Sequence, residues 1–163
     1  MQKKILLTII LVVILGLILY LKYLPKKEIH YHAGFRVYID RKEEDFSKIK
    51  YMSVLACETE EEEHKENEQL EKAHLHDRVG DVVHVEAEGA KWKDLFENIS
   101  YQFDKAEELI GYVNGQKTEN ILDYPIKSYD SVIIFSGRID EDLLRTAVTK
   151  ERIKEVEKIV QNC

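Results

Sequence analysis

The stretch that most limits how this chain can fold runs from Tyr31 to Ile39, where apolar and polar side chains alternate. Its apolar positions are Tyr31, Ala33, Phe35, Val37 and Ile39, and the positions between them are His32, Gly34, Arg36 and Tyr38. Because successive side chains of a β-strand point to opposite faces of a sheet, this alternation predicts a half-buried strand. The residues from Asp81 to Glu88 alternate in the same way and predict a second strand.

A helix is expected to cover the apolar face of that sheet. The apolar residues between 92 and 99 recur at the spacing of an amphipathic helix, and they are Trp92, Leu95, Phe96 and Ile99. Further strands are expected at 51–57, at 109–113 before the turn pair Asn114-Gly115, and at 131–136. Two short apolar stripes beyond residue 140 indicate C-terminal helices that pack on the sheet. These patterns predict an α+β fold with a mixed or antiparallel sheet packed on an amphipathic helix.

The residues from Ile5 to Leu21 form an apolar run that is interrupted only by Thr8 and Gly16 and has lysines on both sides. At about 1.5 Å per residue, a helix of this length measures roughly 25 Å, the short end of what crosses a bilayer. A cleaved signal peptide is the alternative, but the small residues of a cleavage site are missing from 21–25. The run therefore predicts a signal anchor, that is, a transmembrane helix that contacts the lipid bilayer through residues 5–21.

The predicted organisation has four parts. They are a transmembrane anchor at 1–24, a linker at 25–29, an α+β globular domain at 30–140 and a C-terminal helical segment at 141–163. Because few residues precede the span, we expect a single-pass protein with its N-terminus inside and its globular domain outside the cytoplasm. Within the domain, the acidic stretch 58–73 predicts a solvated loop or an exposed helix. An extracytoplasmic location would allow Cys57 and Cys163 to pair.

Charge and motif content exclude several kinds of protein. The chain carries 31 acidic and 24 basic residues and a net charge of −7, so it lacks the clustered surplus of Lys and Arg that binding to nucleic acid requires. It also lacks a nucleophile elbow, a P-loop, a dinucleotide-binding glycine motif and a CxxC pair. A binding protein is therefore indicated more strongly than an enzyme, and a membrane protein is the open candidate for a protein partner.

The region from Val82 to Gly137 resembles a β-grasp (ubiquitin-like) unit. A first strand precedes the helix that begins at Trp92, and Tyr112-Val113-Asn114-Gly115 and the residues 126–135 follow it, in an order similar to that of small sulfur-carrier domains. This chain does not end in the Gly-Gly of sulfur carriers. The resemblance therefore implies a topology and not carrier chemistry.

Three histidine-containing sequences carry a second resemblance. They are His30-x-His32-Ala-Gly-Phe, His74-x-His76-Asp77 and His84-x-Glu86-Ala-x-Gly. Together they are similar to sequences in a group of small, membrane-anchored, extracytoplasmic His-rich proteins of archaea and bacteria. This resemblance implies the layout of an anchor followed by a domain, and it implies no activity.

Five of the 6 histidines stand two residues from another potential metal ligand. The pairs are His30 with His32, His74 with His76, and His84 with Glu86. On a strand, residues two apart point to the same side, so each pair presents two ligands to one place. Imidazole nitrogens and carboxylate oxygens suit Zn²⁺ or Cu²⁺. We therefore predict a non-catalytic transition-metal site on which three or four of these six side chains converge, with an affinity that falls below about pH 6 as histidines protonate.

Two alternatives remain open from the sequence. The histidines could be exposed or hydrogen-bonded structural residues in a membrane-tethered interaction or assembly module. A metallo-hydrolase would instead need an open coordination position and a carboxylate base, for which Glu86 and Asp77 are the nearest candidates. Ring positions separate metal binding from the interaction module, because ring nitrogens from different strands within about 4–5 Å of a common point favour an ion bound at about 2 Å.

Overall fold

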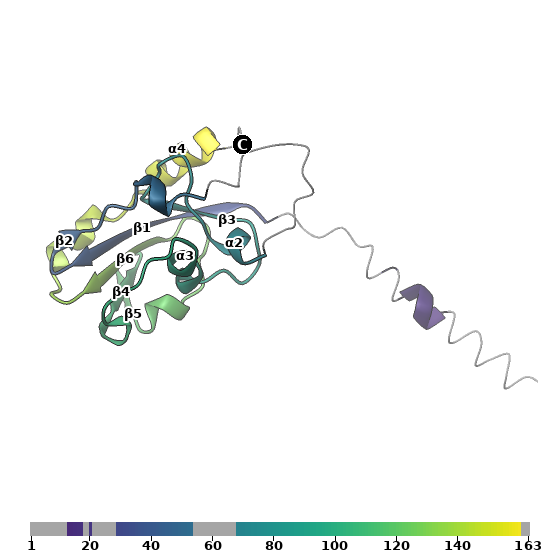
Figure 1. Ribbon diagram of the computed structural model, residues 1–163, viewed down its shortest axis with the longest axis horizontal. Coiled ribbons are helices and arrows are strands. Elements are labelled where there is room, and N and C mark those ends of the chain that lie inside the picture. The colour runs from purple at the N-terminus through teal and green to yellow at the C-terminus, as the bar shows by residue number, and fades with distance from the viewer. Residues whose placement is uncertain (1–12, 18–19, 21–28, 54–67, 161–163) are drawn as a thin grey trace, which may run out of the picture.

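The sheet is built around its longest strand, β1 (Figure 1). The computed structural model describes residues 13–17, 20, 29–53 and 68–160. The strands are β1 (Tyr31–Ile39), β2 (Lys42–Glu43), β3 (Val82–Val85), β4 (Ile110–Val113), β5 (Gln116–Thr118) and β6 (Ser131–Ser136). Their order is β2-β1-β6-β4-β5, with β1 and β6 parallel and β3 paired antiparallel to β1. The sheet is thus mixed, and with its helices the fold is α+β.

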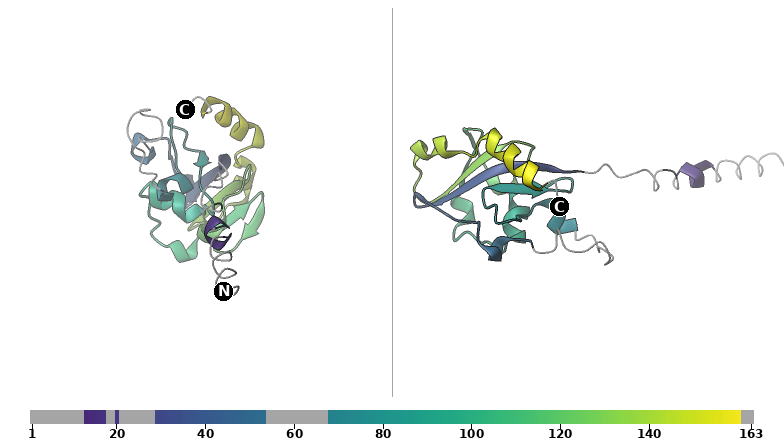
Figure 2. Two further views of the ribbon diagram at one scale, coloured as in Figure 1. Left: turned by 90° about the vertical axis from the view of Figure 1, so that its right-hand side faces the viewer. Right: turned by 90° about the horizontal axis from the view of Figure 1, so that it is seen from above.

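Helices and 3₁₀ turns lie on both faces of this sheet (Figures 1 and 2). The α-helices are α2 (Glu68–Lys72), α3 (Trp92–Asn98) and α4 (Lys150–Val160). The 3₁₀ turns are η1 (Ile49–Tyr51), η2 (Ala106–Glu108), η3 (Ile121–Asp123) and η4 (Glu141–Thr146). The strand expected at 51–57 is wrong where it is described, because Tyr51 closes η1, and residues 54–57 lie outside the described residues.

One face of β1 packs on α3, as the amphipathic pattern predicts. The backbone N–H of Lys91 donates to the Asp94 carboxylate at 2.8 Å, which satisfies a donor at the helix start. The Phe35 ring lies 5.8 Å from that of Trp92 and 6.2 Å from that of Phe96, measured between centroids. Aromatic rings at these separations fill the main core, so α3 is held to the sheet by apolar burial.

The other face of β1 is covered by the C-terminal elements η4 and α4 (Figure 2). A Cβ atom on Gly34 would lie 2.5 Å from the Cβ of Val148, so only glycine lets the segment before α4 approach this closely. Val82 packs there with Ile153 and Val156. The expected C-terminal packing on the sheet is confirmed. β1 is accordingly buried on both faces and not half-buried, because both layers remove it from water.

The turn pair Asn114-Gly115 joins β4 to β5. Their φ angles are 50° and 81°, the left-handed values that a tight hairpin turn requires at both central positions. Within 82–137, the region of the β-grasp resemblance, β6 pairs antiparallel with β4, and its parallel partner is β1, which lies outside that region. The strand β3, which precedes the helix, pairs with β1 instead.

The predicted transmembrane helix needs correction. Among the described residues, no helix has both the length and the apolar character needed to cross a bilayer. The helical residues described there are 13–17 and 20. The predictions of a membrane anchor, of a single-pass protein and of an extracytoplasmic domain that depended on it are wrong on this finding. Residues 1–12, 18–19 and 21–28 lie outside the described residues.

The acidic stretch predicted at 58–73 is described only from residue 68. Its described end forms α2, which contacts α3. The Asn98 side-chain amide donates to the carbonyl of Gln69 at 2.8 Å and to that of Ala73 at 2.7 Å. These bonds fix the chain that leads directly to His74. Cys57 and Cys163, and with them the expected pairing, lie outside the described residues.

Candidate metal centre

A tight turn brings the segment that carries His74 and His76 alongside β3. Asp77 and Arg78 have left-handed φ angles of 55° and 58°, and the backbone N–H of Val79 donates to the carbonyl of His76 at 3.0 Å. The chain thereby reverses direction. His74 and His84 then exchange two backbone hydrogen bonds of 3.0 Å each. The turn thus adds a third extended segment beside β3 and β1.

Three histidines form one row across these three segments. His32 of β1 pairs directly with His84 of β3, and His84 pairs on its other side with His74. Directly paired residues of a sheet place their side chains on the same face. The ring centroids of His32 and His84 are 4.6 Å apart, and those of His74 and His84 are 4.8 Å apart. The strand register therefore makes His84 the centre of the row.

The remaining candidates flank the row at positions two residues away. The ring of His30 lies 4.5 Å from that of His84, and the ring of His76 lies 4.9 Å from it, measured between centroids. An oxygen of the Glu86 carboxylate lies 3.2 Å from Nε2 of His84. All six predicted ligands thus come together around one ring, that of His84.

The cluster contains two groups of three histidines, which share His84. We call His74, His76 and His84 the inner trio and His30, His32 and His84 the outer trio. In each trio the potential ligand atoms all lie within 4.8 Å of one another. Every member of the inner trio is buried, whereas His30 of the outer trio is exposed. Both trios have a geometry that could hold a metal ion.

Two inner histidines are oriented by hydrogen bonds on their far nitrogens. Nδ1 of His76 lies 2.7 Å from a carboxylate oxygen of Asp77, and Nδ1 of His74 lies 3.1 Å from the carbonyl oxygen of Leu70. Each of these oxygens accepts, so the ring proton sits on Nδ1 and Nε2 carries the lone pair, which in His76 lies 2.8 Å from Nδ1 of His84. Metal-binding histidines commonly have this arrangement, in which an acceptor holds the far nitrogen. Both rings are thus prepared to coordinate through Nε2.

Several buried nitrogens of the cluster lack a hydrogen bond. His32 is only 2% exposed, and neither of its ring nitrogens has a hydrogen-bond partner within the described part of the chain. The same holds for Nε2 of His74, which is 3% exposed. A buried polar group without a partner costs about 1–3 kcal/mol. The fold therefore buries ring nitrogens here that form no hydrogen bond with any described residue.

Burial keeps these histidines neutral. Loss of hydration lowers the pKa of His32 to about 3 and that of His74 to about 4, and it also lowers the pKa of His84. Contact with His84 lowers the pKa of Glu86 to about 2, so its carboxylate is ionised. Neutral imidazoles and a carboxylate are the forms that bind a divalent ion. Any loss of affinity in acid is therefore expected at a lower pH than the reference histidine value implies.

Comparison with known proteins gives this chain no assigned relative. No family model, curated protein or solved structure matches it. The interpretation of the site rests on the chemistry of its own side chains.

The sequence did not indicate every residue that shapes the cluster. The sequence offers Asp77 as a candidate hydrolytic base, whereas in the structure it holds His76, and its position directly after that histidine is the signal for this role. Leu70 contributes a backbone carbonyl, which no sequence pattern marks. His64, the remaining histidine, lies outside the described residues.

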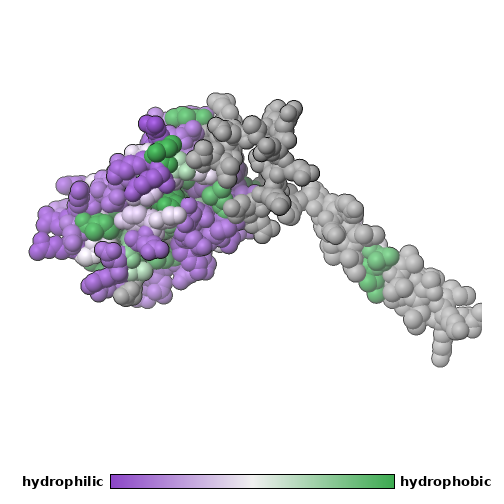
Figure 3. Space-filling model, viewed as in Figure 1, coloured by the Kyte–Doolittle hydropathy of each residue, from purple (hydrophilic) through white to green (hydrophobic). Residues whose placement is uncertain are grey.

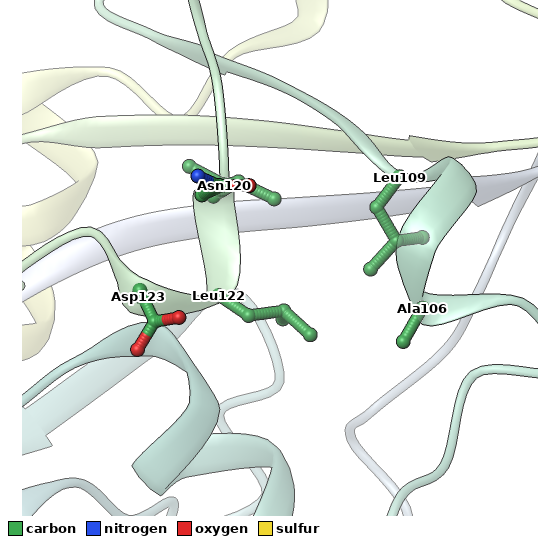
Figure 4. Close-up of a pocket in the computed structure, with 6 residues that line it drawn as sticks. Ala106, Leu109, Asn120, Leu122 and Asp123 are labelled. Carbon is green, nitrogen blue, oxygen red and sulfur yellow. The ribbon is translucent and has the colours of Figure 1, made fainter.

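A pocket of about 160 Å³ lies elsewhere, between η2 and η3 (Figure 4). It is lined by Ala106, Leu109, Asn120, Ile121, Leu122 and Asp123. The Asp123 carboxylate accepts from Lys93 at 2.9 Å and from Lys91 at 3.4 Å, so its negative charge is already paired with lysines. This pocket contains no histidine and does not open onto a group of metal ligands.

Proposed function

We propose that this chain is a transition-metal-binding domain that holds Zn²⁺ or Cu²⁺ at the inner trio without chemical turnover. The observation that carries the proposal is the convergence of three buried imidazole rings, among which Nε2 of His74 has no hydrogen-bond partner among the described residues. A bound ion would accept lone pairs from His74, His76 and His84 and would give the buried Nε2 of His74 the partner that it lacks among the described residues. The oxygens of Glu86 are the nearest additional ligands, at 3.2 Å from His84 Nε2 and 4.0 Å from His74 Nε2.

The spacing of the inner trio fits a first-row ion. Four ligands at about 2.0–2.1 Å from a tetrahedral Zn²⁺ lie roughly 3.3–3.4 Å from one another. The trio has its nitrogens within 4.8 Å, and Nε2 of His76 lies 2.8 Å from Nδ1 of His84. The inner trio is therefore close to the spacing that a tetrahedral ion requires, although its ligand atoms are not yet at that spacing. Imidazole and carboxylate ligands suit both Zn²⁺ and Cu²⁺.

Burial supports binding in preference to catalysis. A hydrolytic metal needs an open coordination position beside a base in a pocket. The inner histidines are each at most 7% exposed, and Asp77 is engaged with His76.

On the face shown in Figure 3, hydrophilic residues predominate over the described domain and apolar residues form separate patches. The convergence of the rings also favours metal binding over an interaction module with incidental histidines.

Calorimetric titration of the full-length, metal-free protein with Zn²⁺ and with Cu²⁺ tests the proposal. The unchanged protein is expected to bind with a saturable heat, and the double variant His74→Leu, His84→Leu is expected to lose that heat. Tyr38→Phe is the matched control, because Tyr38 is buried on the same strand and face as His32 but lies outside the cluster. Equal or negligible heats for all three proteins would contradict the proposal.

A further inference from the structure

The two nitrogens of His84 face different partners. Nδ1 lies 2.8 Å from Nε2 of His76, whereas Nε2 lies 3.2 Å from the carboxylate of Glu86. His84 is also the one residue that the inner and outer trios share. A single imidazole ring can bind one ion through each of its nitrogens. The position of His84 therefore allows both trios to be occupied together.

A single ion leaves part of the cluster unsatisfied. An ion in the inner trio leaves both nitrogens of His32 buried without a partner, and an ion in the outer trio leaves Nε2 of His74 in that state. The cluster also contains five imidazoles, whereas a zinc ion in a protein takes four ligands. Two ions would engage the unpartnered nitrogens on both sides of His84.

We propose that the cluster binds two transition-metal ions, one in each trio, bridged by the ring of His84. This inference rests on the proposed function and extends it to a second ion. The bridging ring gives up its N–H proton to solvent, so that each of its two nitrogens donates a lone pair to one ion. The two oxygens of Glu86 face Nε2 of His84 and Nε2 of His74, and they can add one ligand to each ion.

The outer trio also provides the route by which ions enter. His30 is exposed and stacks on His84 at 4.5 Å between ring centroids, whereas His32 and the whole inner trio are buried. An ion that reaches His30 from solvent is thus already beside the shared ring. The carboxylate of Glu86, which is also exposed, adds an attractive negative charge at the same place.

Copper loading of the full-length protein measures both the number of ions and the bridge. The metal-free protein is loaded with excess Cu²⁺ and desalted, and the copper content and the electron paramagnetic resonance intensity are measured. We expect two copper ions per chain and an intensity well below that of two isolated ions, because Cu²⁺ ions joined through one imidazole ring couple magnetically.

His30→Ala removes an exposed ligand of the outer trio and leaves the core intact. This variant is expected to retain one copper ion with the full intensity of an isolated Cu²⁺. Glu88→Gln, at an exposed position two residues beyond Glu86, is the control and is expected to keep two coupled ions.

The outcomes separate this inference from the proposed function. One copper ion per chain in the unchanged protein overturns the second ion and leaves the proposed function standing, whereas no bound copper overturns both. Two ions with the full intensity of isolated Cu²⁺, or a His30→Ala variant that keeps two coupled ions, overturn the shared ring.

Discussion

The two faces of β1 are buried to nearly the same extent, but one packs apolar side chains together and the other buries polar ring nitrogens. Phe35 is fully buried at 0% exposure and its ring packs on aromatic rings of α3. His32 on the other face is 2% exposed, and its two ring nitrogens have no hydrogen-bond partner among the residues that the structure describes. Apolar contact completes the first face. Burial on the second face removes water from polar atoms without replacing it. Similar burial therefore stabilises one face and leaves the other in need of a ligand.

Truncation of the apolar face should have the largest effect. Phe35→Ala removes a buried ring and leaves a cavity, which is expected to lower the free energy of unfolding by about 3–5 kcal/mol. This loss should be the same with and without Zn²⁺, because Phe35 faces away from the histidines. Urea unfolding in both conditions measures it, and a loss that depends on the metal would break the comparison between the faces.

Metal should stabilise the protein only through the histidine face. At a free Zn²⁺ concentration of 100 times the dissociation constant, the free energy of unfolding is expected to rise by about 2.7 kcal/mol, since the ion binds the folded state. In His84→Leu, which lacks the ring shared by both trios, thermal unfolding should show no such rise. A similar stabilisation of this variant would mean that the ion binds elsewhere.

Without metal, an apolar residue should suit the histidine face better than histidine does. His32→Leu removes two buried nitrogens that lack partners, and it is expected to raise the stability of the metal-free protein by roughly 1–3 kcal/mol. The same variant should bind less metal. Urea unfolding of both metal-free proteins checks this, and destabilisation by His32→Leu would show that His32 is already satisfied in the metal-free fold.

A further expected effect concerns acid. The pKa values of His32 and His74 are lowered in the folded state to about 3 and about 4, so the unfolded chain takes up protons first as the pH falls. The free energy of unfolding is therefore unaffected by these two histidines above about pH 6.5. Below that pH it falls progressively, by about 1.4 kcal/mol per pH unit for each histidine.

The slope of the free energy of unfolding with pH reflects how many more protons the unfolded chain binds than the folded chain. His32→Leu should therefore reduce that difference by about one proton between about pH 6 and pH 4. Urea unfolding of the metal-free proteins at pH 7, 6 and 5 compares the slopes. Identical slopes for the variant and the unchanged protein would show that His32 does not resist protonation.

Local alternation was sufficient to predict which residues share a face. In β1 and β3, a period of two places His32 opposite Phe35 in the strand and His84 opposite Val83, and the structure has this arrangement. The position of α3 followed from the spacing of its apolar residues in the same way. The facing of strand residues and the position of a helix follow from the spacing of nearby residues, so a single sequence is enough to predict them.

The sequence predicts that three or four of the six side chains converge, but it does not predict the strand pairing that brings all six together. That pairing joins His32 to His84 and His74 to His84, and the segments that carry these residues are separated in the chain. The transmembrane prediction was wrong. Composition alone indicated a continuous helix at 5–21, whereas no helix among the described residues meets the length and apolarity that a bilayer requires.

Anomalous X-ray diffraction from crystals of the full-length protein loaded with Zn²⁺ tests the central claim most directly, because it locates the ion without assuming its ligands. The account predicts an anomalous peak at coordination distance, about 2 Å, from the ring nitrogens of His74, His76 and His84. Fully loaded crystals whose anomalous peaks all lie at surface carboxylates, with none among the histidine rings, would contradict it.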